Sequence, residues 1–181
     1  MKKSIYLMGV GGQGILTAGS VLANVAANNN LEVALTPVYS PAVRGGDSFV
    51  EIIISDAPIE NPFMDHADLI FSLTSIDSAS IIHYVDEKTE LFYDETVDIT
   101  CIPCNCGKYP VKIKNADVCR DPRKIGLVLV SFIIQYCFPQ LMDAAKNGVI
   151  LKKLCNETEW AAITGTIQQF VKRHLVAEKD A

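Results

Sequence analysis

Short apolar runs and one longer amphipathic run alternate along the first part of the chain. Ile15–Ala27 places its apolar residues at the 3.6-residue spacing of a helix. The short runs around it are rich in β-branched residues, which is typical of strands inside a sheet. The four predicted strands are Ser4–Val10, Val33–Val38, Ser48–Ser55 and Asp68–Thr74. Because strand–helix–strand units form parallel sheets, the pattern predicts an α/β fold: a mostly parallel open sheet flanked by helices, with a Rossmann-like first βαβ unit.

Weaker patterns continue this alternation to the end of the chain. The expected elements are a helix at about Ser75–Tyr84, strands at Glu90–Asp94 and Val111–Lys114, a helix that begins at Asp121-Pro122 and is closed by Pro139, and a terminal helix at Glu157–Glu178. The apolar run Ile125–Phe138 is shorter than the roughly 18 residues of a membrane span. We expect it to be a buried or interface helix, forming part of an apolar face that a partner covers. No low-complexity linker or internal repeat divides the chain, so we expect one domain over residues 1–181.

Composition and charge narrow the classes of function. Of the 181 residues, 49% are hydrophobic and 20% are charged, which is ordinary for a folded protein. The net charge of −5 gives no reason to expect binding to nucleic acid or to an acidic membrane surface. No signal-peptide cleavage site follows the basic start, and six cysteines without an export signal indicate reduced thiols. We therefore expect a cytoplasmic protein.

A glycine-rich turn joins the first predicted strand to the first predicted helix. Gly9-Val10-Gly11-Gly12-Gln13-Gly14 matches the pattern G-x-G-x-x-G. Glycines let the chain reverse tightly and let a ligand approach the bare backbone, while the helix N-terminus offers free N–H groups to an anion. The alternative is that the glycines only permit tight packing. NAD is disfavoured because the second strand does not end in an acidic residue, and Gly14 is not followed by the Lys-Ser/Thr of a P-loop.

A second turn follows the second strand, at the same carboxyl edge of the sheet. Arg44 precedes Gly45 and Gly46, which sets a guanidinium beside open backbone N–H groups, a combination that recognises phosphate or carboxylate. The alternative is a solvated loop with an incidental arginine. Ligands of open α/β sheets bind outside the carboxyl ends of the strands, so we expect both turns to form one cofactor-binding site. The candidates are Gly9, Gly11, Gly12, Gln13, Gly14, Tyr39, Arg44, Gly45, Gly46, Asp47 and Ser48.

Two segments together resemble the gamma subunit of 2-oxoacid:ferredoxin oxidoreductases of the pyruvate, 2-oxoglutarate or ketoisovalerate type. They are GVGGQGILTAGSVLA at Gly9–Ala23 and YSPAVRGGDSFVEIIIS at Tyr39–Ser55. The resemblance covers about Met1–Thr74 and fades afterwards. It implies that residues 1–181 form one pyruvate/ketoisovalerate oxidoreductase gamma-type catalytic domain. It also implies that the candidate turns face the junction of coenzyme A and the thiamine site.

The resemblance further implies an enzyme subunit that is inactive alone. The whole enzyme would convert a 2-oxoacid oxidatively into an acyl-CoA and CO2 and pass electrons to ferredoxin. Coenzyme A, thiamine diphosphate and iron–sulfur clusters would act in the assembled enzyme, with none bound tightly by this chain alone. The implied partners are alpha and beta subunits, with a ferredoxin-like delta subunit as a further candidate, and ferredoxin through the complex. The specific 2-oxoacid and the subunit stoichiometry stay open.

No catalytic or metal-binding set is predicted within the chain. His66, His83 and His174 are scattered, and no spacing suggests a catalytic triad or a carboxylate pair. Cys101, Cys104, Cys106 and Cys119 lack the ferredoxin spacing and are interpreted as reduced thiols, with a metal site as the alternative. Two other functions stay open: the beta subunit of indolepyruvate ferredoxin oxidoreductase, and a free-standing ligand-binding regulatory domain that uses the same two turns.

Overall fold

The computed structural model describes residues 1–39, 46–75, 81–100, 102, 106–111 and 124–179. Its strands are β1 (Lys2–Val10), β2 (Glu32–Tyr39), β3 (Asp47–Ser55), β4 (Leu69–Ser72), β5 (Glu90–Asp94) and β6 (Gly107–Val111). Its α-helices are α1 (Ile15–Ala27), α3 (Ile125–Cys137), α4 (Met142–Asn147), α5 (Val149–Leu154) and α6 (Glu157–Lys179), and short 3-10 helices η1 (Ile82–Tyr84) and η3 (Pro139–Leu141) lie between them.

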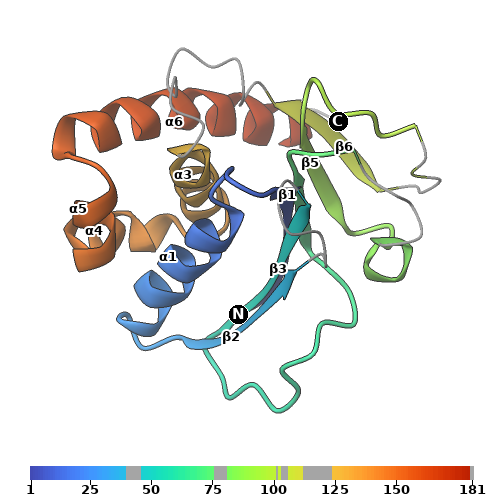
Figure 1. Ribbon diagram of the computed structural model, residues 1–181, viewed down its shortest axis with the longest axis horizontal. Coiled ribbons are helices and arrows are strands. Elements are labelled where there is room, and N and C mark those ends of the chain that lie inside the picture. The colour runs from blue at the N-terminus through green and yellow to red at the C-terminus, as the bar shows by residue number, and fades with distance from the viewer. Residues whose placement is uncertain (40–45, 76–80, 101, 103–105, 112–123, 180–181) are drawn as a thin grey trace.

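The strands form one sheet in the order β2-β3-β1-β4-β5-β6 (Figure 1). Three neighbouring pairs, β1–β4, β4–β5 and β5–β6, are parallel, as the sequence predicts. β3 is antiparallel to both β1 and β2. The expected α/β sheet is therefore confirmed, but the first βαβ unit departs from the Rossmann pattern: β1 and β2 point the same way, and an antiparallel strand lies between them.

The α-helices of the described residues gather on one face of the sheet, whereas the 3-10 helix η1 lies on the other. There, α1, α3 and α6 pack against every second residue of the strands, such as Leu7, Ile52 and Phe71. Together they form the main core. A smaller core on the other face joins Tyr6, Met8 and Ile53 to residues of the connecting segments. This division follows from the strand geometry, because successive side chains point to opposite faces.

Helix α3 is the centre of the main core. Its first ten residues, Ile125–Ile134, are all buried, and it packs against both α1 and α6. A helix that is hydrophobic on every side is buried in a globular domain. The expectation that this run forms part of an exposed apolar face is therefore wrong. The exposed large hydrophobic residues among those described lie elsewhere, at Met1, Leu35, Val38, Phe63 and Ile82.

Several predicted boundaries need correction. Of the predicted strand Val111–Lys114, Val111 is the last residue of β6, and residues 112–114 lie outside the described residues. The described strand begins earlier than predicted, because β6 pairs with β5 through Gly107–Val111 despite the glycine and proline in that stretch. Half of the predicted helix at Ser75–Tyr84, residues 76–80, lies outside the described residues, and its described end contains the 3-10 helix η1. The start predicted at Asp121-Pro122 also lies outside them. Helices α4 and α5 were not predicted.

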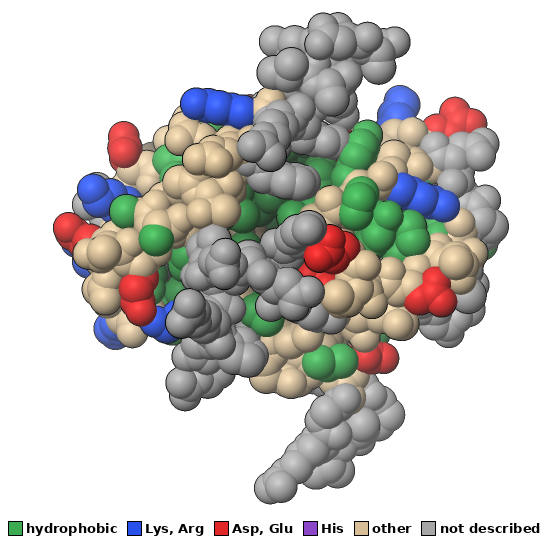
Figure 2. Space-filling view, turned by 90° about the horizontal axis from the view of Figure 1, so that it is seen from above, with side chains coloured by type: hydrophobic (Ala, Val, Ile, Leu, Met, Phe, Trp, Pro, Cys, Tyr) green, Lys and Arg blue, Asp and Glu red, His purple; other side chains and the backbone are tan. Residues whose placement is uncertain are grey.

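The described residues contain no helix that is both long enough and apolar enough to cross a membrane. Seen from above, the described part of the molecule carries acidic and basic side chains interspersed around its outline (Figure 2). On this face the basic side chains do not gather into a stripe like that of a nucleic-acid-binding surface.

Candidate functional site

The glycine turn reverses the chain between the end of β1 and the start of α1. Gly12 has φ +94° and Gly14 has φ +74°, a left-handed conformation that costs glycine little and other residues more. A Cβ at Gly12 would meet no atom within 4 Å, so conformation and not space requires glycine there. The sequence reasoning that a tight reversal needs these glycines is therefore supported by the backbone angles.

Gln13 holds the turn closed. Its backbone N–H donates to the carbonyl of Val10 at 3.1 Å, and its side-chain Oε1 accepts the N–H of Val10 at 2.9 Å. A Cβ at Gly9 would lie 2.7 Å from the same Oε1 and 2.7 Å from the side chain of Ile15. Gly9 and Gln13 thus support the turn from inside, and neither is among the residues that line the hollow beside it.

The glycine turn lies at the same edge of the sheet as the described end of the second turn, Gly46 and Asp47. The register pairs Val10 with Asp47, so the end of β1 lies beside the start of β3. The N–H of Gly11 donates to the carbonyl of Gly46 at 3.1 Å. The glycine turn and the last residue of the second turn are therefore tied directly by their backbones.

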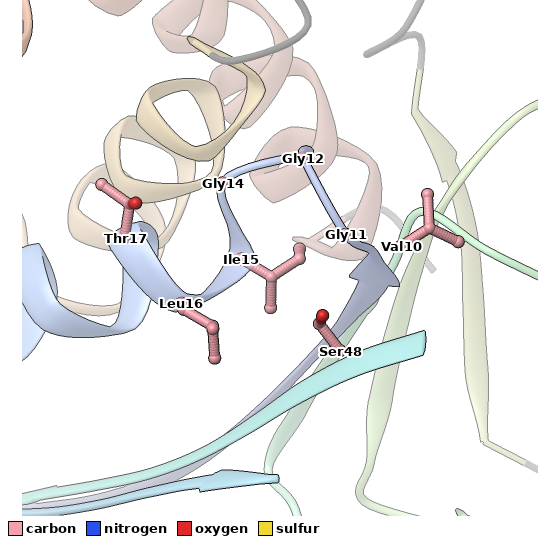
Figure 3. Close-up of a pocket in the computed structure, with 8 residues that line it drawn as sticks. All are labelled: Val10, Gly11, Gly12, Gly14, Ile15, Leu16, Thr17 and Ser48. Carbon is pink, nitrogen blue, oxygen red and sulfur yellow. The ribbon is translucent and has the colours of Figure 1, made fainter. Parts of the chain in front are cut away.

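A hollow of about 320 Å³ opens beside this junction (Figure 3). It is lined by Val10, Gly11, Gly12, Gly14, Ile15, Leu16, Thr17 and Ser48. Ser48 extends from β3 towards Ile15, and Thr17 lies in the first turn of α1. The lining thus combines bare backbone, two hydroxyl groups and short apolar side chains, which suits a small polar group carried on a larger ligand.

The start of α1 gives the hollow a positive character. The carbonyl of Gly14 accepts the N–H of Ala18 at 2.8 Å, so the N–H groups of Ile15, Leu16 and Thr17 precede the first intrahelical bond. No side chain caps this end, and its first turn contains no acidic residue. The described lining of the hollow carries no carboxylate either. An anion is therefore the ligand that this helix terminus favours.

The structure separates the predicted site residues into groups. Gly11, Gly12, Gly14 and Ser48 line the hollow, and Gly46 contributes its carbonyl to the bond between the turns. Asp47 is exposed at the start of β3, and strand alternation directs it to the face opposite that of Ser48. The backbone of Tyr39 pairs with Ser48. Arg44 and Gly45 lie outside the described residues.

The sequence reasoning missed part of the lining. Val10, Ile15, Leu16 and Thr17 were read as strand and helix residues, yet they border the hollow. The signal was available for Thr17, because the third residue of a helix that follows a glycine turn stands beside the free N–H groups.

The described cysteines do not form a site. Cys106 and Cys155 are buried and Cys137 is half-buried, and no group of three or more metal-binding side chains occurs among the described residues. Burial raises the pKa of the Cys137 thiol to about 12, which keeps it protonated and unreactive. Cys101, Cys104 and Cys119 lie outside the described part of the chain, so the prediction about them stays a prediction.

The opposite face of the sheet holds a polar cluster in which Tyr6 is buried and Glu51 and Tyr84 are half-buried. Tyr84 donates its hydroxyl to Oε1 of Glu51 at 2.7 Å, and its ring stacks on Tyr6 with centroids 4.8 Å apart. Tyr6 is 4% exposed, and burial, with a smaller contribution from the Glu51 charge, raises its pKa to about 12. The hydrogen bond and the stacking explain how these groups are accommodated inside the protein.

An open α/β sheet with a glycine turn and an uncapped helix N-terminus at its carboxyl edge is an arrangement that many cofactor- and anion-binding domains share. Comparison with known proteins identifies the family. Residues 4–150 match the family model described as pyruvate ferredoxin/flavodoxin oxidoreductase, so the chain belongs to that family.

Relatives and solved structures agree with this assignment. The chain is 44% identical over 75 residues to the 2-oxoglutarate synthase subunit KorC of Methanocaldococcus jannaschii, covering 41% of this chain and 40% of that protein. The matches thus span about half or less of the length of these relatives. The likeness to indolepyruvate oxidoreductase subunit IorB of Methanothermobacter thermautotrophicus is weaker, at 26% identity over 97 residues, 54% of this chain and 50% of that protein.

The fold recurs in two solved structures. The gamma subunit of a keto/oxoacid ferredoxin oxidoreductase from Geobacter sulfurreducens superposes with a TM-score of 0.70 at 22% identity, covering 98% of both chains. A 2-oxoglutarate:ferredoxin oxidoreductase from Magnetococcus marinus, with 2-oxoglutarate, coenzyme A and succinyl-CoA bound, gives 0.80 at 17% identity over 95% of this chain and 31% of that one. At these identities the likeness establishes the fold.

Proposed function

We propose that this chain is the gamma subunit of a 2-oxoacid:ferredoxin oxidoreductase, and that it is inactive alone. Family membership supports this proposal, as does the fold shared along nearly the whole length of a gamma subunit. The reacting groups would then come from alpha and beta subunits, with a ferredoxin-like delta subunit as a further candidate.

Within that enzyme, we propose that the hollow binds an anionic group of coenzyme A beside the thiamine site. The observation that carries this proposal is the uncapped start of α1, whose free N–H groups border a hollow without a carboxylate. The hydroxyls of Thr17 and Ser48 add donors, and the sequence places Arg44 in the adjoining turn. A phosphate group fits this donor set because backbone N–H groups, hydroxyls and a guanidinium all donate to its oxygens.

This chain's own residues would bind and orient. Coenzyme A supplies the thiol that accepts the acyl group when it is bound. The bond from Gly11 to Gly46 would keep the two turns together, so that groups from both face one ligand. Thiamine diphosphate and iron–sulfur clusters would be held by partner chains, as the resemblance to the gamma subunit implies.

The experiment that tests the proposed function starts from the native assembly. The tagged chain is purified from its source cell, its companion chains are identified, and the complex is assayed for ferredoxin reduction with pyruvate, 2-oxoglutarate, ketoisovalerate and indolepyruvate. We expect alpha- and beta-type companions and activity that depends on coenzyme A. Preference for indolepyruvate would instead support the beta subunit of that oxidoreductase. A chain that purifies alone would support a free-standing ligand-binding domain.

A further inference from the structure

The glycine turn rests directly on the start of α3. Gly126 is the second residue of that helix and is buried. A Cβ built at Gly126 would lie 2.4 Å from the carbonyl oxygen of Gly14 and 3.0 Å from its carbonyl carbon. Only a hydrogen fits in that position. A helix 112 residues further along the chain thus packs against the backbone of the turn.

This contact differs from the other tight glycine of the helical layer. At Gly19 in α1, an added Cβ would meet the side chains of Val50 at 2.7 Å and Leu35 at 3.2 Å. Side chains can change rotamer and yield. At Gly126 the three nearest atoms are all backbone atoms of Gly14, so no rotamer change relieves the overlap. Ordinary contact begins at 3.4 Å, so a side chain at position 126 would require a displacement of about 1 Å.

The turn would move more easily than the helix. Residues of α3 such as Phe132 and Ile133 are 0% exposed in the centre of the core, whereas Gly11 and Gly12 are exposed. Displacing α3 would disturb its packing on both α1 and α6, and close-packed interiors resist such shifts. A side chain at position 126 would therefore push Gly14 and the first N–H groups of α1 out of place.

We propose that Gly126 is a positioning residue for the anion site: the start of α3 is a fixed support that aims the first N–H groups of α1 into the hollow. This inference rests on the proposed function of the hollow. It predicts that a substitution outside the lining changes ligand affinity through the backbone of Gly14. Because donors displaced by about 1 Å lose much of their hydrogen bonding, we expect coenzyme A to bind roughly 10- to 100-fold more weakly.

The test compares Gly126→Ala with Gly165→Ala. Gly165 lies in α6, where an added Cβ meets nothing within 4 Å, so the control makes the same change without the contact. Two measurements are made: the backbone amide resonances of Gly12–Thr17 in the isolated chain, and the Kd of the assembled complex for coenzyme A by calorimetry. We expect Gly126→Ala to shift these resonances and raise Kd, with kcat at saturating coenzyme A retained. Gly165→Ala should change none of these quantities.

A second variant decides the matter if Gly126→Ala does not fold. Ile125→Ala removes buried packing beside Gly126, and Ile163→Ala makes the same kind of change in α6. We expect Ile125→Ala to speed amide hydrogen exchange at Gly14–Leu16 more than Ile163→Ala does. If neither Gly126→Ala nor Ile125→Ala changes the turn more than its control variant in α6 does, the positioning role is wrong. If the turn moves but the Kd for coenzyme A is unchanged, positioning stands and the proposed function of the hollow fails.

Discussion

Thr17 allows the charge of the hollow to be changed without disturbing its shape. It is exposed in the first turn of α1 and lines the hollow. Glutamate and glutamine have nearly the same shape and similar helix propensity. Thr17→Glu and Thr17→Gln therefore differ mainly by one negative charge, placed where the proposed anion would sit.

The charge should stabilise the isolated chain. The first turn of α1 has no acidic residue and no side-chain cap. A carboxylate there interacts favourably with the helix dipole by about 0.3–1 kcal/mol. For a chain of this size, that gain corresponds to a Tm higher by about 1–4 °C in Thr17→Glu than in Thr17→Gln.

The same charge should weaken ligand binding. Treated as a sphere, a hollow of about 320 Å³ has a radius of roughly 4 Å, so an anion inside it would lie roughly 6 Å from the new carboxylate. With an effective dielectric constant between about 20 and 80, the repulsion is about 1–3 kcal/mol, since the site is open to solvent. Binding of coenzyme A should then be roughly 5- to 100-fold weaker.

The assay measures both quantities on both variants: Tm of the isolated chain by calorimetry, and Kd of the assembled complex for coenzyme A at low and high salt. We expect Thr17→Glu to be the more stable chain and the weaker binder, with the difference in Kd reduced by salt. Equal Kd values for the two variants would refute the reasoning that the start of α1 binds an anionic part of coenzyme A.

Three further predictions concern other parts of the molecule. The pure chain, given a 2-oxoacid, thiamine diphosphate and coenzyme A, should reduce neither ferredoxin nor dye; measurable reduction would show that it holds a catalytic set of its own. Arg44→Ala should weaken coenzyme A binding by about 1.5–3 kcal/mol through loss of a charge-assisted contact, while Lys152→Ala, an exposed lysine in α5, should leave the Kd unchanged. Because the pKa of Tyr6 is raised to about 12 in the folded chain, the unfolded chain loses this proton at lower pH than the folded chain does. The contribution of the protonated hydroxyl to the free energy of unfolding is therefore complete below pH 10 and is lost as pH rises towards 12. Unfolding titrations should show this loss in the wild type and a smaller one in Tyr6→Phe.

The regular part of the fold could be predicted because its local signals agree. Helix α1 has the predicted bounds, Ile15–Ala27, because its apolar spacing begins after glycines and ends at asparagines. The strand β5 also has its predicted bounds. The antiparallel direction of β3 was missed, although the short connection between β2 and β3 indicates it. Only residues 40–46 separate β2 from β3, whereas a parallel crossover needs about a dozen or more residues.

The candidate site was predictable only in its local parts. Gly11, Gly12 and Gly14 follow from the need for a tight reversal, and Ser48 follows from the strand that begins after the second turn. The contact of Gly126 with Gly14 joins segments that are far apart in the sequence, and no local pattern records it. Burial of α3 was one of the two alternatives predicted for that run, and the absence of a polar side favours it over an interface helix.

The central claim is that the hollow between the glycine turn and Ser48 binds an anionic group of coenzyme A. The most direct measurement is an experimental structure of the assembled complex with coenzyme A bound. We predict a phosphate of coenzyme A in the hollow, accepting hydrogen bonds from the first N–H groups of α1 and close to Arg44. Coenzyme A bound elsewhere, with the hollow filled by a partner's side chains, would contradict the account.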